Sequence, residues 1–290
     1  MKKVGFVSIL GRPNTGKSTL INAIMKTELS IITPTPQTTR DRIKGIYNDD
    51  ESQIIFIDTP GIHKPVQKLG DSLNNRSYMS IQEADINLFL SPINEEIGKG
   101  DELILQKLLP ENTICIISKI DLSNESKAKG KAQEFKDKGF QNVLGVSSEW
   151  DTSIVHLITF LKERLKEGHP FYEDEWTDKS TSFFIKEIIR ESIINNTSDE
   201  VPYSVGVLIR NYDNTKKMKN VTIISANIYV ARESQKGIII GKNGTMIKTI
   251  GTSSRIKIEN MLGEKIFLDL SVKVMKNWYN KLNNLEKLGY

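Results

Sequence analysis

Short apolar runs and amphipathic segments alternate along the first half of the chain. Runs of strand length cover residues 4–10, 53–57, 86–90, 113–118 and 143–146, and helix-like stretches at 71–83, 101–109 and 127–138 separate the later ones. This alternation predicts an α/β domain with a mostly parallel sheet and helices on both faces. Ligands of such sheets bind beyond the carboxyl ends of the strands, so the residues just past these runs are the informative ones.

The pattern changes at a linker, which we expect over residues 168–180 because this segment contains Gly, Pro and a run of acidic residues. Residues 1–167 then form the first domain and residues 181–290 the second. The second domain shows the order helix, two strands, helix-loop-helix and strand, with regular elements expected at residues 182–196, 203–210, 221–232 and 265–274. This order predicts a small α+β domain.

The most specific motif is the sequence GRPNTGKS at residues 11–18, between the first apolar run and a helix that starts near Lys17. Backbone N–H groups and the positive end of a helix would converge there on nucleotide phosphates. Lys17 would reach the β- and γ-phosphates, and the Ser18 hydroxyl would bind Mg²⁺. An ordinary glycine-rich turn is the alternative, which so many matching residue types disfavour. The candidate phosphate contacts are Gly11, Asn14, Thr15, Gly16, Lys17, Ser18 and Thr19.

A second motif would complete a triphosphate site, namely Asp-Thr-Pro-Gly at the end of the run 53–57. Asp58 is expected to hold Mg²⁺ through water, and the amide of Gly61 can approach a γ-phosphate because no side chain intervenes. The polar segment 36–40 offers a hydroxyl, from Thr38 or Thr39, to complete the metal shell. We favour Thr39, which together with Lys17, Gly61 and Asn14 forms the predicted catalytic set.

The base is predicted from Ser118-Lys119-Ile120-Asp121, which is close to the NKxD pattern that recognises guanine. The Asp121 carboxylate would accept two hydrogen bonds from guanine, whereas adenine offers no such pair of donors. After the next strand, Ser147, Ser148 and Glu149 occupy the place where a backbone N–H normally contacts the guanine O6. With these motifs in order, the chain resembles a translation-factor-class GTPase.

Ser118 and Ser148 depart from the usual pattern, in which asparagine and alanine stand at these positions. Ser148 should matter little because its contact comes from the backbone. Ser118 is shorter than asparagine, so we expect it to lose a contact to guanine N7 and one to the phosphate loop, about 1 kcal/mol for a neutral hydrogen bond. The prediction is weaker GTP binding with the preference for guanine retained.

Ile62 stands where many GTPases carry a glutamine that orients the attacking water, so intrinsic hydrolysis should be slow or assisted. Asn14 matches the asparagine of potassium-activated relatives, and this resemblance implies a K⁺ ion beside the phosphates. A monovalent cation there would offset developing charge. The alternative for Asn14 is a loop residue that caps its own turn.

The second domain contains a GxxG loop, Gly241-Lys-Asn-Gly244, after the apolar residues 238–240. Glycines let the backbone approach sugar-phosphates, and the apolar groove beside them takes unstacked bases of a single strand. With its order of elements, the domain resembles a KH domain of the prokaryotic topology. Trp278 and Tyr279 would either stack on bases or pack on the sheet. The candidate RNA contacts are Lys236, Ile240, Gly241, Lys242, Asn243, Gly244 and Lys248.

Charge is distributed unevenly along the chain, whose net charge is +4. Residues 201–290 carry 15 Lys and Arg against 6 Asp and Glu, a net of +9, which leaves −5 for residues 1–200. A basic second half indicates a polyanionic partner. The single cysteine, Cys115, lies in an apolar run and allows no internal disulfide. The apolar runs are too short to cross a bilayer, so we expect a soluble cytoplasmic protein.

Taken together, several segments resemble bacterial Era, a family that joins a GTPase domain to a C-terminal KH domain. They are GRPNTGKSTL, PQTTRDRI, IDTPGI, the linker, EVPYS at 200–204, IGKNG and the terminal Leu-Gly-Tyr. The resemblance implies GTP and Mg²⁺ as ligands, binding near the 3′ end of small-subunit ribosomal RNA, and a role in assembly of the 30S subunit. It also implies loose peripheral membrane contact, and we expect a monomer.

Two other classes of protein remain as alternatives. A metabolic P-loop kinase would share the phosphate loop, but the guanine motif and the absence of an acceptor-binding module argue against it. An RNA-binding scaffold with a degenerate nucleotide site is favoured only by Ser118 and Ile62.

Overall fold

The computed structural model describes residues 1–36, 38–65, 67–218 and 221–290. It divides into two compact units, residues 1–66 with 70–178 and residues 67–69 with 179–290. The boundary at residues 178 and 179 falls inside the segment expected to be the linker. No helix of the described segments is long and apolar enough to span a membrane.

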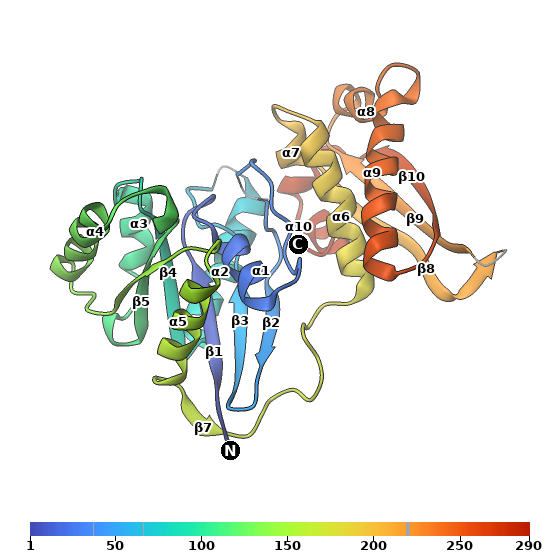
Figure 1. The fold of residues 1–290 in the computed structure, drawn as a ribbon. Coiled ribbons are helices and arrows are strands. Elements are labelled where there is room, and N and C mark those ends of the chain that lie inside the picture. Colours follow the sequence, from blue (N-terminus) through green and yellow to red (C-terminus); the bar gives the residue numbers. More distant parts are fainter. Residues whose placement is uncertain (37, 66, 219–220) are drawn as a thin grey trace. The chain divides into compact units, whose positions relative to one another are not determined.

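The first unit is built on one seven-stranded sheet with the order β2-β3-β1-β4-β5-β6, and β7 pairs with β1 (Figure 1). Pairing is parallel between β1 and β3, β1 and β4, β4 and β5, and β5 and β6, while β2 and β7 are antiparallel to their partners. The mostly parallel α/β sheet predicted from the sequence is therefore confirmed. Its strands are β1 (Lys2–Leu10), β2 (Ile43–Asn48), β3 (Ser52–Asp58), β4 (Ile86–Pro92), β5 (Thr113–Ser118), β6 (Val143–Val146) and β7 (Lys166–Gly168).

Helices cover both faces of this sheet because its central strands are buried throughout. On one face α1 and α5 lie together (Figure 1). On the other, residues of α3 and α4 share a hydrophobic cluster with β1, β4 and β5, and residues of α2 pack against it. The carboxyl ends of β1, β3 and β5 are left to carry polar residues. The helices are α1 (Lys17–Met25), α2 (Lys68–Glu83), α3 (Lys99–Leu105), α4 (Glu125–Asp137) and α5 (Asp151–Lys162), with 3-10 turns η1 (Pro110–Asn112) and η2 (Ile120–Leu122).

The second unit has a three-stranded sheet with the order β10-β9-β8, in which β9 is antiparallel to β8 and parallel to β10. Helices α6 and α9 pack on it around an isoleucine- and valine-rich core. The order helix, strand, strand, helix-loop-helix, strand matches the prediction. The elements are α6 (Thr181–Asn196), α7 (Val201–Ser204), β8 (Gly206–Met218), β9 (Val221–Val230), α8 (Glu233–Ile240), η3 (Lys242–Gly244), α9 (Thr245–Leu262) and β10 (Ile266–Val274).

The C-terminal segment settles the alternatives for Trp278. It contains η4 (Trp278–Asn280) and α10 (Leu282–Lys287). The indole of Trp278 is fully buried, donates to the Ser204 carbonyl at 2.8 Å and stacks on Tyr290. It therefore packs on the domain and is not exposed to stack on bases.

A candidate nucleotide site and a candidate RNA loop

The phosphate loop leaves the end of β1 and enters α1, as the sequence predicts. Gly16 has a φ of 96° and Asn14 a φ of 63°, so the loop turns through left-handed backbone before the helix begins. Lys17 is buried, and its Nζ donates to the Arg12 carbonyl at 2.6 Å. Gly11 and Thr15 are not among the residues that line the phosphate cavity. Gly11 shapes the loop instead, because a Cβ at this position would lie 2.8 Å from the Leu90 carbonyl oxygen.

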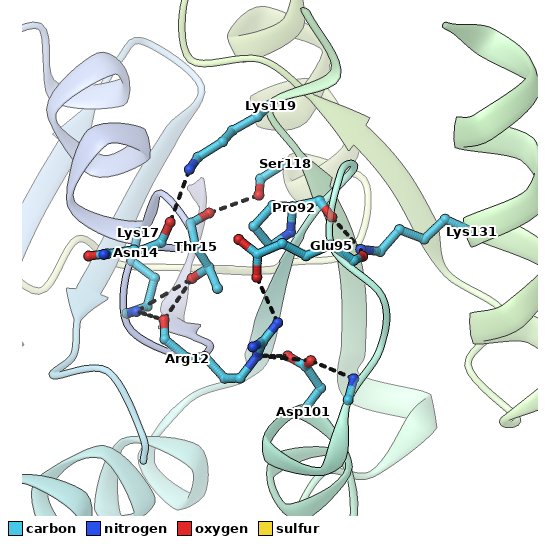
Figure 2. A network of polar contacts seen from close by, with 11 residues as sticks. Arg12, Asn14, Thr15, Lys17, Pro92, Glu95, Asp101, Ser118, Lys119 and Lys131 are labelled. Atoms are coloured by element: carbon cyan, nitrogen blue, oxygen red, sulfur yellow. Dashed lines mark hydrogen bonds and ion pairs between the residues drawn. The ribbon is translucent and has the colours of Figure 1, made fainter. Parts of the chain in front are cut away.

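Arg12 ties this loop to two distant segments (Figure 2). Its guanidinium bonds the buried Asp101 carboxylate of α3 at 2.9 Å and the Glu95 carboxylate at 2.8 Å. Lys131 of α4, also buried, donates to the carbonyls of Pro92 and Glu95 in the same network. The sequence analysis gave Arg12 no role, because its partners lie more than eighty residues away and form no local motif.

Three oxygen-bearing side chains from separate segments meet beside the loop. The Ser18 hydroxyl lies 2.8 Å from the Thr39 hydroxyl and donates to the Asp58 carboxylate at 3.0 Å. The second carboxylate oxygen of Asp58 is buried and has no hydrogen-bond partner among the described residues. Hydroxyl and carboxylate oxygens are ligands that Mg²⁺ prefers, with phosphates and water completing its octahedron. The donor set therefore fits the predicted metal.

Burial perturbs the two charged groups of this site in opposite senses. It lowers the pKa of Lys17 to about 8, against the attraction of Asp58, and it raises the pKa of Asp58, against the attraction of Lys17. Desolvation disfavours the charged form of each group. A phosphate placed between the loop and Lys17 would restore a partner to the ammonium.

The structure distinguishes Thr39 from its neighbour. Thr38 bonds the Thr33 hydroxyl at 2.6 Å and the Thr35 carbonyl at 2.7 Å, so it serves the loop itself. Of these two threonines, Thr39 is the one whose hydroxyl contacts Ser18 among the described hydrogen bonds. The choice of Thr39 over Thr38 is thus supported by geometry, although its role in binding stays a prediction.

Gly61 and Ile62 point in different directions from the segment after β3. Gly61 lines a cavity of about 290 Å³ together with Lys17, Ser18 and Thr39. Ile62 is 4% exposed and belongs to the hydrophobic cluster that α3 and α4 share with β1, β4 and β5. Its side chain is packed in the core, so another group must orient the attacking water.

A second cavity, of about 240 Å³, adjoins the first and shares Gly16, Thr19 and Lys119 with it. The residues predicted to read guanine gather here. Asp121 lines this cavity and accepts a hydrogen bond from the Ser147 hydroxyl at 2.6 Å, which fixes the carboxylate. The cavity is also lined by Ser118, Ser148 and Glu149. Ser147 does not line it and contributes through its hydrogen bond to Asp121.

One expectation for Ser118 is wrong. Its hydroxyl donates to the Thr15 carbonyl at 2.8 Å, so the contact to the phosphate loop is kept (Figure 2). Lys119 adds a second tie, from its Nζ to the Asn14 carbonyl at 3.0 Å. A serine hydroxyl has a single proton, and this bond uses it. The expected loss is therefore confined to guanine N7.

Among the contacts described for the Asn14 side chain, none caps its own turn. Its side-chain amide donates instead to the Pro34 carbonyl at 3.4 Å, across the mouth of the phosphate cavity. The alternative reading of Asn14 as a local cap therefore finds no support.

The GxxG loop of the second unit has the backbone that its glycines predict. Gly241 and Gly244 have φ values of 74° and 76°, and a Cβ on Gly241 would lie 2.7 Å from the Cβ of Met246. A Cβ on Gly244 would meet nothing within 4 Å, which leaves room for another backbone. Lys242, Asn243 and Lys248 are exposed beside it, Lys236 and Ile240 are partly buried, and Ile238 is 46% exposed.

Family comparisons agree with both halves of the architecture. Residues 6–119 match the model described as "50S ribosome-binding GTPase", and residues 200–279 match that of the KH domain. Fold and site thus define a P-loop GTPase joined to a KH domain of RNA-binding type.

Similar proteins of known name extend along the whole chain. GTPase Era of Mycoplasmopsis agalactiae is 46% identical, covering 99% of both chains, and GTPase Era of Mycoplasmopsis pulmonis is 47% identical over 96% of this chain and 97% of its own. A crystal structure of an Aquifex aeolicus Era variant bound to GDP.AlF4⁻ superposes with a TM-score of 0.93 at 36% identity, with 99% of each chain covered. A structure of Era with MgGDPNP and nucleotides 1506–1542 of 16S ribosomal RNA gives 0.94 at 35% identity, covering 100% of this chain and 99% of the other. The chain belongs to the Era family of GTPases.

Proposed function

We propose that this GTPase is a GTP-driven switch that binds the 3′ end of small-subunit ribosomal RNA and assists assembly of the 30S subunit. The observation that carries the proposal is the position of the Ser18 hydroxyl, which lies 2.8 Å from the Thr39 hydroxyl and 3.0 Å from the Asp58 carboxylate, although the three residues come from sequence-distant segments. Such a cluster lets Mg²⁺ and a γ-phosphate order several segments at once. The match to Era bound to MgGDPNP and 16S ribosomal RNA supports the choice of ligands.

In this proposal each part of the nucleotide has its own partners. The backbone of residues 11–16 and Lys17 hold the phosphates, while Ser18, Thr39 and Asp58, the last through water, hold Mg²⁺. Mg²⁺ bound there would neutralise charge on the β- and γ-phosphates. Asp121 reads guanine, supported by Ser147, and the amide of Gly61 receives the γ-phosphate.

Single-stranded RNA binds, in the same proposal, along the loop between α8 and α9. The open space over Gly244 admits the RNA backbone, and the exposed Ile238 with Ile240 offers an apolar surface to bases. Lys236, Lys242 and Lys248 form no ion pair within the described parts of the chain, so their charges are available to phosphates.

The linker offers a route from the nucleotide to the RNA-binding domain. Strand β2 directly follows the segment of Thr39, and Trp176 accepts a backbone hydrogen bond from Ile46 of that strand at 2.9 Å. Gln53 of β3 clasps Tyr172, donating to its carbonyl at 2.7 Å and accepting from its N–H at 3.1 Å. We propose that ordering of Thr39 by Mg²⁺ and GTP changes the position of β2, and that β2 transmits this change to the linker.

We further propose that K⁺ assists hydrolysis at Asn14. Ile62 is packed in the core and cannot orient water, so hydrolysis would depend more on a cation beside the phosphates, which would offset the negative charge that develops there. The side-chain NH2 of Asn14 donates to the Pro34 carbonyl, and the side-chain carbonyl oxygen of Asn14 would be the ligand for the cation. Turnover should be faster in K⁺ than in Na⁺ for the natural protein and equal in both for Asn14→Ala; equal rates in the natural protein would refute the K⁺ role.

Location, oligomeric state and membrane contact belong to the same proposal. With ribosomal RNA as its partner, the protein would act in the cytoplasm. We expect a monomer, and peripheral membrane contact is what the family resemblance implies.

The decisive experiment measures multiple-turnover GTP hydrolysis with and without 30S subunits, and RNA affinity with GDP and with a non-hydrolysable GTP analogue. We expect slow turnover that 30S subunits accelerate, and RNA affinity that differs between the two nucleotides. Equal RNA affinity in both states would overturn the switch. Absence of turnover would favour a scaffold, and a phosphorylated product other than inorganic phosphate would indicate a kinase.

A further inference from the structure

Two buried polar residues of α2 hold the segment after β3 by its backbone. Asn74 and Ser77 lie three residues apart and are 8% and 0% exposed. The Ser77 hydroxyl donates to the Pro60 carbonyl at 2.9 Å. The Asn74 amide donates to the His63 carbonyl at 2.7 Å and accepts from the His63 N–H at 3.3 Å. Both ends of the four-residue segment that contains Gly61 are therefore attached to one helix.

These bonds set the direction of the Gly61 amide. The peptide between Pro60 and Gly61 is trans, so its N–H points opposite to the carbonyl that Ser77 holds. Gly61 lines the phosphate cavity, whereas Ser77 does not. On the other side, Ile62 donates to the Gly11 carbonyl at 3.1 Å, and a Cβ on Gly61 would lie 2.7 Å from the Pro13 nitrogen. The amide is thus clamped between α2 and the phosphate loop.

We infer that Ser77 and Asn74 are positioning residues that aim the Gly61 amide at the γ-phosphate and so set the discrimination between GTP and GDP. This inference rests on the proposed function of the site. GDP has no γ-phosphate and makes no use of this amide. Loss of the clamp therefore weakens GTP binding selectively, because the freed peptide must be ordered when the γ-phosphate arrives.

If the role of Ser77 were purely structural, its loss would weaken the binding of GDP and of a GTP analogue equally. Its hydroxyl also lies 3.1 Å from the Leu73 carbonyl, one helical turn earlier, and helix serines often bond in this way. Ser80 has the same arrangement, with its hydroxyl 3.0 Å from the Arg76 carbonyl. Ser80 is equally buried on the same helix but has no bond to the Pro60–His63 segment among those described. It provides a matched control.

The test compares the natural protein with Ser77→Ala, Ser80→Ala and Asn74→Ala. For each, the dissociation constants of GDP and of a non-hydrolysable GTP analogue are measured with Mg²⁺ by the same equilibrium method. We expect Ser77→Ala to weaken the analogue about five-fold, the effect of one neutral hydrogen bond, and to leave GDP affinity within about two-fold. Asn74→Ala should act in the same direction, and Ser80→Ala should leave the ratio of the two constants unchanged.

Thermal unfolding of each variant accompanies the binding data, so that a general loss of stability is seen as such. If Ser77→Ala weakens GDP and the analogue equally, or if Ser80→Ala changes the ratio as much, the inference is wrong. If the natural protein binds neither guanine nucleotide, the proposed function fails and the inference fails with it. The first result leaves the proposed function intact, so the two failures are distinguishable.

Discussion

Replacing Ser118 by asparagine should tighten GTP binding through one identifiable atom of the base. In the structure the Ser118 hydroxyl donates its only proton to the Thr15 carbonyl, at 2.8 Å. An asparagine amide has two protons, so it can keep the bond to Thr15 and still donate to guanine N7. The natural protein is thus expected to make no bond to N7, and Ser118→Asn is expected to add one.

The expected gain follows from the kind of bond that is added. A neutral hydrogen bond contributes about 1 kcal/mol net, which corresponds to about a five-fold lower dissociation constant. Ser118 is 6% exposed, so the new bond would be shielded from water and should reach that size. Preference for guanine over adenine should stay with Asp121, whose carboxylate is held by Ser147.

The assay compares GTP with 7-deaza-GTP, which has a carbon in place of N7. The natural protein should bind the two nucleotides equally, whereas Ser118→Asn should bind GTP about five-fold more tightly than 7-deaza-GTP. Ser118→Ala serves as the matched control, because it removes the tie to Thr15 and should weaken both nucleotides to the same extent.

Two results would refute this reasoning. If the natural protein already binds 7-deaza-GTP more weakly, another donor reaches N7 and the single-proton argument is wrong. If Ser118→Asn improves both nucleotides equally, its effect comes from the phosphate loop and not from the base.

Four further predictions concern other parts of the molecule. Phosphate binding should raise the depressed pKa of Lys17, so GTP binding takes up a proton and weakens as the pH rises above about 8; calorimetry in buffers of different ionisation enthalpy measures that uptake, and none near this pH would contradict it. For the nucleotide-free protein the folded state binds fewer protons than the unfolded state at Lys17, so this residue makes the free energy of unfolding rise with pH above about 8, as denaturant titrations would detect. Lys242→Ala and Lys248→Ala should each weaken RNA binding and reduce its salt dependence by about one charge without changing GTP hydrolysis, and an unchanged salt slope would exclude them from the interface. Gln53→Ala should release Tyr172 and reduce the difference in RNA affinity between GDP and a GTP analogue, whereas an undiminished difference would show that the linker contact does not transmit the switch.

Much of the fold could be predicted because local patterns of apolar and polar residues indicate most of its strands and helices. The expected strand at 113–118 coincides with β5, and the one at 143–146 coincides with β6. Strand β2 escapes prediction because it lies at the sheet edge and mixes Lys44 and Gly45 among its apolar residues. An edge strand needs little apolar surface, since much of its pairing energy comes from the neighbouring β3.

For the candidate site, the sequence by itself determined which chemical groups are present and in which order. Asp58 ends a strand, whereas GRPNTGKS, Gly61 and Asp121 come after strand ends, and parallel strands place their carboxyl ends at one edge. A motif records residue types at fixed spacing, and this was enough to predict a guanine nucleotide, a metal and, with Gly241-Lys-Asn-Gly244, an RNA loop.

Only the tertiary structure decided which hydrogen bonds these groups make. It placed the Thr39 hydroxyl beside that of Ser18, directed the Ser118 hydroxyl to the Thr15 carbonyl, and brought Arg12 to Asp101. The partners in these bonds come from segments about twenty to one hundred residues apart. A shift of a few ångströms between such segments would give each group a different partner. Hydrogen bonds depend on such distances, and packing of the whole domain sets them, so local sequence does not encode them.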